Sequence, residues 1–250
     1  MKVENTKVFK KSAVALTMAL GFSSFGFAQP VATTTFRVQV VHIKPDMVNE
    51  WADLQKYEVI PALKKAGQST RTVYQTYAFG SSYEYTIVTP FAKFAEFDGQ
   101  TPLLKALGQP ATARLNMKLA KCIESSTAYA LTRMTDISNV LPEPTEFIVS
   151  ARYRIAAGKM QDFQNLVKSD VLPVYKKANT SLLVNRRTYG ANPNDVTMVT
   201  GYSKMADLDG GTLLTKQLGE DGAAKVNAKF TGIRTIIEVL IRRRVADLSF

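Results

Sequence analysis

Alternation of apolar and polar residues marks the strands of this chain. Between residues 36 and 43, the even-numbered residues from Phe36 to His42 fall on one face and the odd-numbered residues from Arg37 to Ile43 on the other. A period of two over this length is typical of a β-strand. Similar patterns predict further strands at 71–79, 83–89, 126–134, 147–155, 183–189, 196–202 and 235–245.

Helical spacing of apolar residues appears between the strands. Val48, Trp51 and Val59 share one helix face, and the series from Met160 to Val174 repeats that spacing later in the chain. Pro61 and Pro173 should kink or restart these helices, because proline lacks the backbone donor. Second helical regions are predicted at 91–123, with breaks at 98–99 and 108, and at 205–232. The predicted order is β-α-β-β-α-β, twice.

The two halves are copies of one unit. At an offset of 111 or 112 residues, segment 59–67 matches 171–179 at five of nine positions, and 95–108 matches 206–219 at eight of fourteen. An internal repeat of this kind decides the fold before any single element does. We therefore predict a first unit at 29–140 and a second at 141–250, joined by the short proline-bearing connector 141–145.

The βαββαβ order predicts an α+β fold of two tandem ferredoxin-like units. Each unit has a four-stranded antiparallel sheet with helices on one face, which leaves the other face bare. Packing the two sheets together would cover both bare faces. We therefore expect an intrachain α/β barrel, a monomeric pseudo-dimer.

Strand 36–43, the helix end 58–67 and their counterparts at 147–155 and 170–179 resemble the dimeric α/β-barrel superfamily. Within it, the chain is most similar to antibiotic-biosynthesis-monooxygenase-type and NIPSNAP-like domains. The resemblance implies a pocket between sheet and helices within a unit, in a family where many members have no known activity. Haem-degrading relatives supply an axial histidine from a helix, and no predicted helix here contains one, which argues against haem.

The N-terminal residues have the features of a signal peptide. Residues 1–11 carry four lysines against Glu4, residues 12–27 carry no charge, and small residues precede a cleavage point near Ala28. We expect cleavage there and a periplasmic or secreted protein with no stable membrane insertion. The alternative is an uncleaved anchor, for which the apolar run is short.

The remaining composition narrows the chemistry. Residues 1–28 hold four basic side chains and one acidic, so their removal lowers the net charge from +11 to +8. Export argues against nucleic acid and favours small anions or an anionic envelope surface as partners. Cys122 is the only cysteine and His42 the only histidine, too few for a zinc site. No nucleotide-binding, serine-hydrolase or thioredoxin-like motif is present, and we expect no cofactor.

His42 and the aromatic residues are the candidate ligand-pocket residues. The alternation places His42 with Val38 and Val40, which we interpret as the face under the helices, and the repeat makes Tyr153 its counterpart. A lone imidazole on an apolar wall could act as a general base or accept a ligand proton, or could simply be a hydrogen-bonded strand-end residue. Trp51, Tyr74 and Tyr85 make the first copy richer in aromatics. Ordinary packing accounts for such residues, and they also suit a pocket for a ring-bearing ligand, so if one half carries a pocket we expect it to be the first.

Arginines are frequent on the predicted strands. The ordinary expectation is solvent exposure at strand edges. A cluster inside the barrel would need carboxylates such as Glu84 or Glu238, or a bound anion. Arg242, Arg243 and Arg244 must alternate between faces and cannot all serve one site.

Three functions remain open. The leading hypothesis is an exported module that binds a small aromatic or anionic ligand without catalysis. The alternatives are a cofactor-independent monooxygenase or isomerase that uses His42 with a tyrosine, and a structural envelope protein without a ligand.

Overall fold

The computed structural model describes residues 34–142 and 144–250, so the predicted signal peptide lies outside the described residues. Thr33–Phe250 form one compact unit. Its strands are β1 (Thr35–Ile43), β2 (Thr72–Thr76), β3 (Glu84–Phe91), β4 (Ile123–Arg133), β5 (Phe147–Ile155), β6 (Leu182–Tyr189), β7 (Asp195–Tyr202) and β8 (Arg234–Arg244).

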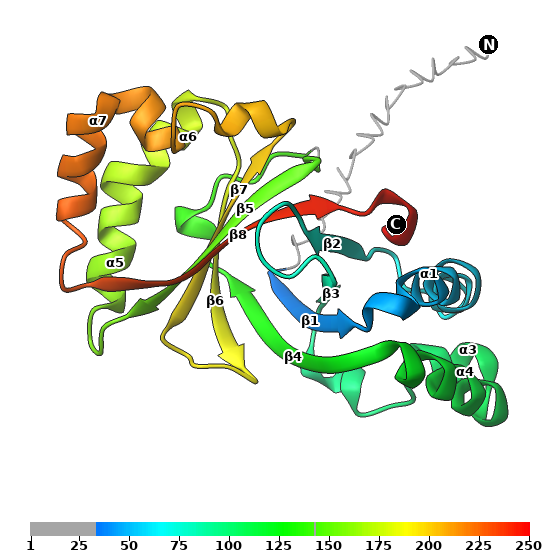
Figure 1. Ribbon diagram of the computed structural model, residues 1–250. Helices are drawn as coiled ribbons and strands as arrows, with labels where there is room; N and C mark the ends of the chain where they lie inside the picture. Colours follow the sequence, from blue (N-terminus) through cyan, green and yellow to red (C-terminus); the bar gives the residue numbers. More distant parts are fainter. Residues whose placement is uncertain (1–33, 143) are drawn as a thin grey trace, which may run out of the picture. The chain divides into compact units, whose positions relative to one another are not determined.

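The eight strands close into one antiparallel barrel in the order β1-β3-β2-β8-β5-β7-β6-β4 (Figure 1). Within it, β4-β1-β3-β2 and β8-β5-β7-β6 are two ferredoxin-like sheets of the same order. They join edge to edge, where Tyr74 of β2 pairs with Arg244 of β8 and Arg133 of β4 pairs with Asn185 of β6. The bare faces of both sheets become the barrel interior. The predicted fold, two ferredoxin-like units in an intrachain α/β barrel, is confirmed.

Each half covers the outer face of its own sheet with helices, and Figure 1 shows the two helical layers on opposite sides of the barrel. The helices of the first half are α1 (Val48–Asp53), α2 (Ile60–Lys65), α3 (Pro102–Leu107) and α4 (Gln109–Cys122), and those of the second are α5 (Met160–Leu166), α6 (Leu172–Lys177) and α7 (Leu213–Ala228). Gly108, at φ 75°, separates α3 from α4 as the sequence predicts. None of the helices in the described part is both long and apolar enough to cross a membrane.

Pro61 and Pro173 shape the first helix of each half in the same way. A π-helical turn precedes each proline, η2 (Leu54–Val59) before α2 and η5 (Val167–Val171) before α6. Proline cannot donate the α-helical hydrogen bond, and a π turn accommodates the missing donor without ending the helix. The expected interruption is therefore a local widening of a continuous helix.

The halves exchange their last residues. The turn η7 (Ala246–Leu248) follows β8 but packs into the core of the first half, where Leu248 is buried. The turn η4 (Thr135–Ile137) follows β4 and places Ile137 in the core of the second half. Each helix-and-sheet core thus needs a segment from the other half, which ties the two units together.

The two faces of β1 are the reverse of the sequence interpretation. Val41 and Ile43 belong to the core under the helices, so the alternate residues, including His42, face the barrel interior. The interpretation that His42 lies under the helices is wrong. Alternation separates the faces of a strand without saying which of them meets the helices, and here both faces carry apolar residues.

Candidate functional site

A cavity of about 920 Å³ lies in the first half, between the outer face of its sheet and its helices. Trp51, Val59 and Leu63 line it from the helical side, and Val41 and Ile87 from the sheet. The volume falls in the range of small-molecule sites. The wall is mainly apolar, and two arginines interrupt it.

Arg71, just before β2, is the more deeply placed arginine. Its residue is only 3% exposed, and its Nη2 donates a 2.6 Å hydrogen bond to Oε1 of Gln55. Its Nη1 is buried and has no hydrogen-bond partner in the described structure. Burial lowers the pKa of Arg71 to about 10, so the guanidinium is still charged at neutral pH. The cavity therefore holds a buried cation with an unused donor.

Arg37 of β1 is the second arginine in the cavity wall. Its Nη1 donates to Oε1 of Gln39 at 3.1 Å, and Nε2 of Gln39 donates to Oγ of Ser126 at 3.0 Å. Burial lowers the pKa of Arg37 as well. Both guanidinium groups are thus held by neutral amide oxygens, which leave their charge uncompensated.

No carboxylate offsets this charge within the described part of the cavity. The one acidic residue in its wall is Glu96, whose Oε1 accepts the backbone N–H groups of Ala92 and Lys93 at 2.9 and 3.2 Å. Neither Arg37 nor Arg71 forms an ion pair among the described residues. Buried cations are normally paired, and Arg71, the buried one of these two arginines, has no carboxylate partner in the described structure.

Trp51 forms part of the cavity wall and is 1% exposed. Its ring packs on that of Tyr85, with centroids 4.5 Å apart. Trp51 thus gives the cavity an aromatic wall backed by Tyr85, and an aromatic wall suits a ring-bearing guest.

The second half provides an internal comparison. Its corresponding cavity has about 460 Å³. Arg71 exchanges backbone hydrogen bonds with Phe250, and Leu182 exchanges them with Asn139 in the same way, so Leu182 replaces Arg71. Arg37 and Val149 occupy equivalent places opposite Thr89 and Thr200.

The amide that accepts the Arg71 hydrogen bond is also absent from the second half. Val167 takes the place of Gln55 at the same 112-residue offset. The second cavity instead has Tyr153, Tyr175 and Arg234, and the Arg234 guanidinium lies 4.4 Å from the Tyr153 ring centroid. Arg37, Arg71 and Gln55 are therefore not required by the fold.

The five sequence candidates lie in three places. Trp51 lines the first cavity, and Tyr85 packs behind it. Tyr153 lines the second cavity. His42 and Tyr74 lie on the barrel interior, where His42 Nε2 is 3.6 Å from Oε2 of Glu84.

Two details of the sequence analysis are corrected. His42 pairs with Glu84 across β1 and β3 as Arg154 pairs with Asp195 across β5 and β7, so the counterpart of His42 is Arg154 and not Tyr153. The alternative site of His42 with a tyrosine in the first-half pocket is not assembled, because His42 lies on the other face of the sheet.

The arginines in the cavity are the residues that sequence reasoning placed wrongly. Solvent exposure was the ordinary expectation for strand arginines, and Arg71 contradicts it with 3% exposure. The available signal was the contrast between the copies, because Arg37 and Arg71 align with Val149 and Leu182 once the register of each strand is known.

No protein-family model matches the sequence, and no curated protein does. Solved structures share the fold. A proposed monooxygenase from Lactobacillus acidophilus superposes with a TM-score of 0.54 at 11% identity, over 87% of this chain and 95% of that one. Another proposed monooxygenase, from Fusobacterium nucleatum, gives 0.54 at 10% identity, over 85% and 92% of the two chains.

A chlorite dismutase variant from Candidatus Nitrospira defluvii superposes with a TM-score of 0.53 at 6% identity, over 87% of this chain and 93% of that chain. At such low identities these likenesses establish the fold alone. The chain has the fold of the dimeric α/β-barrel superfamily, with both units in one polypeptide.

Proposed function

We propose that the first-half cavity binds a small organic anion with an aromatic or other apolar body, without catalysis. The observation that carries this proposal is the pair Arg37 and Arg71, which line one cavity and have no carboxylate partner among the described residues. A carboxylate or sulfonate accepts charge-assisted hydrogen bonds from guanidinium groups. Such charge-assisted hydrogen bonds contribute about 1.5–3 kcal/mol each.

The rest of the wall supports an apolar body for the ligand. Trp51, Phe91 and Leu103 are among the lining residues. Binding is preferred to turnover because His42, on which the enzymatic alternative depends, faces the barrel interior. The proposal also includes export through residues 1–28, after which the mature chain would begin at Gln29. Intact mass and N-terminal sequencing of protein from its native host would test that start.

Two dyes with the same ring system test the binding proposal. Anilinonaphthalene sulfonate is an aromatic anion, and phenylnaphthylamine is its uncharged analogue. Both brighten in apolar sites, and Trp51, the only tryptophan, reports their arrival by quenching and energy transfer. We expect the sulfonate to bind the parent protein with the higher affinity.

The variants take their residues from the second half. Arg37→Val and Arg71→Leu introduce the side chains found at Val149 and Leu182, so the fold should tolerate them. Each should weaken sulfonate binding at least about 10-fold and leave the neutral dye unaffected. Arg114→Leu, which removes an exposed charge from α4, is the matched control. Equal affinity of the sulfonate for the parent and the double variant would refute the proposal.

A further inference from the structure

The barrel interior carries more positive than negative charge. Strand register assigns to it six arginines and three carboxylates in the described structure. These are Arg133, Arg152, Arg154, Arg187, Arg242 and Arg244, and Glu84, Asp195 and Glu238. The interior of an eight-stranded barrel is just wide enough for side chains or one small ligand, so this excess lies in confined space.

At one place in the interior the charges balance. Glu84 accepts a 3.1 Å hydrogen bond from Nη2 of Arg242 and a 2.9 Å bond from Oγ1 of Thr76. His42 lies 3.6 Å from the same carboxylate. One arginine per carboxylate, with a hydroxyl filling a remaining position, is an ordinary structural ion pair.

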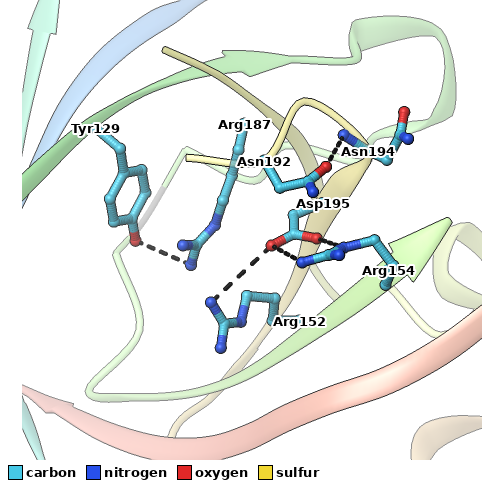
Figure 2. Close-up of polar contacts among 7 residues, drawn as sticks. All are labelled: Tyr129, Arg152, Arg154, Arg187, Asn192, Asn194 and Asp195. Carbon is cyan, nitrogen blue, oxygen red and sulfur yellow. Dashed lines mark hydrogen bonds and ion pairs between the residues drawn. The ribbon is translucent and has the colours of Figure 1, made fainter. Parts of the chain in front are cut away.

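The equivalent place in the second half is not balanced. Asp195, 2% exposed, is in contact with Arg154, and its Oδ2 lies 4.0 Å from Nη1 of Arg152 (Figure 2). Burial lowers the pKa of Arg187, and the like charge of nearby Arg152 lowers it further. Glu238 is the other carboxylate near Arg187. Three arginines therefore converge on this region.

The duplication shows which of these positions carry an arginine in the second half alone. Arg154 replaces His42, and Asp195 replaces Glu84. Arg187 stands where the first half has Thr76, and Arg152, opposite Thr197, stands where it has Val40, opposite Thr86. The first half thus accommodates Glu84 in the barrel interior without a cation at the positions that Arg152 and Arg187 occupy in the second half.

These two arginines also have unused donors. The Nε atoms of Arg152 and Arg187 are buried without a hydrogen-bond partner in the described structure. Nη2 of Arg187 donates to the Tyr129 hydroxyl at 3.2 Å, which leaves the phenolic proton free for another acceptor. The Arg152 side chain is 28% exposed, so solvent reaches this end of the interior.

We propose that a phosphate-class oxyanion binds inside the barrel between Arg152 and Arg187, with the Tyr129 hydroxyl as a third donor. Planar guanidinium groups match such oxyanions in pairs of hydrogen bonds. The anion would offset the positive charge of the three arginines that the two carboxylates Asp195 and Glu238 do not neutralise. This site is separate from the first-half cavity and does not depend on the function proposed for it.

Isothermal titration calorimetry and thermal unfolding with inorganic phosphate, at ionic strength matched with sodium chloride, test the site. We expect phosphate to bind the parent and raise its Tm. Arg187→Thr and Arg152→Val, which introduce the residues of the first half, should each weaken phosphate binding at least about 10-fold. The adjacent Arg186 lies on the outer face of β6, opposite Val196, and is bonded to the Pro193 carbonyl oxygen, so Arg186→Thr is the matched control and should bind phosphate as the parent does.

Further measurements distinguish free phosphate from a phosphate ester as the ligand and identify where it binds. Stronger binding of inorganic phosphate than of glycerol phosphate would support the free ion as ligand, and the reverse order a phosphate ester. If Arg187→Thr does not fold, Arg187→Lys and Arg152→Val carry the same test. Absence of binding by either compound, or a phosphate effect lost in Arg71→Leu and kept in Arg187→Thr, would overturn the proposal.

Discussion

Arg71 and Leu182 occupy the same position in the two halves of the barrel, each in a reciprocal pair of backbone hydrogen bonds with the tail of the other half. Leu182 is fully buried and Arg71 nearly so, at 0% and 3% exposure. The equivalent position thus holds an apolar residue in the second half and a charged residue in the first. Structure alone does not require the charge, so we attribute it to a ligand.

Replacement of the Arg71 and Gln55 pair should stabilise the ligand-free protein. Arg71→Leu alone leaves Gln55 Oε1 without its donor and should be nearly neutral. The double variant Arg71→Leu/Gln55→Val copies Leu182 and Val167, and we expect a gain of about 1–4 kcal/mol in the free energy of unfolding. Urea denaturation measures the free energy of unfolding of the single and the double variant. A double variant that is less stable than the parent would mean that the pair has a structural role.

The exchanged tails should make the two halves unfold together. Leu248→Ala, in the tail that enters the first-half core, should cost about 2–5 kcal/mol, as should Ile137→Ala in the second. Trp51 fluorescence reports the first half, and far-UV circular dichroism reports both. We expect the two signals to coincide in each variant, whereas exposed Met117→Ala should leave stability unchanged. Separate transitions would contradict the coupling.

Much of the fold follows from the sequence, because repetition and alternation are local signals. Strand 147–155 is predicted with its observed bounds, and β2 is shorter than predicted, at Thr72–Thr76. Trp51 is also found from its aromatic character. The assignment of strand faces is not, since Val38 and Val41 are both buried and either face could have met the helices.

The site itself depends on that face assignment. Across β1 and β5 the two halves are related by 112 residues, since His42 lies opposite Glu84 and Arg154 lies opposite Asp195. A sequence offset of 111 therefore pairs His42 with Tyr153, while the structure pairs it with Arg154. The carboxylate-free surroundings of Arg37 and Arg71 depend on long-range packing that no local pattern encodes.

Asp195 should tolerate substitution far less than an exposed carboxylate would. Asp195→Asn leaves Arg152, Arg154 and Arg187 without its charge, and we expect a loss of about 3–5 kcal/mol in the free energy of unfolding. Arg187→Thr should restore part of this loss, because it removes one of the repelling cations. A double-mutant cycle by urea denaturation measures the coupling. Additive effects would show that Arg187 does not interact with this carboxylate.

Buried Tyr202 should make the folded protein less stable in alkali. Burial raises its pKa to about 12 from the ordinary value of 10. The folded state therefore keeps a proton that the unfolded state loses, so this contribution is complete below about pH 10 and disappears as the pH approaches about 12. The urea midpoint of Tyr202→Phe should fall less over this window than that of the parent, and tyrosinate absorbance should report one fewer late-titrating group. Identical pH profiles would contradict the assignment.

Native mass spectrometry of protein purified from its native host tests the central claim most directly. The parent and the Arg37→Val/Arg71→Leu variant would be compared under the same conditions. We predict a non-covalent mass increment on the parent, released on denaturation as a small organic anion, and none on the variant. Equal occupancy of both proteins, or a released compound without an anionic group, would contradict the account.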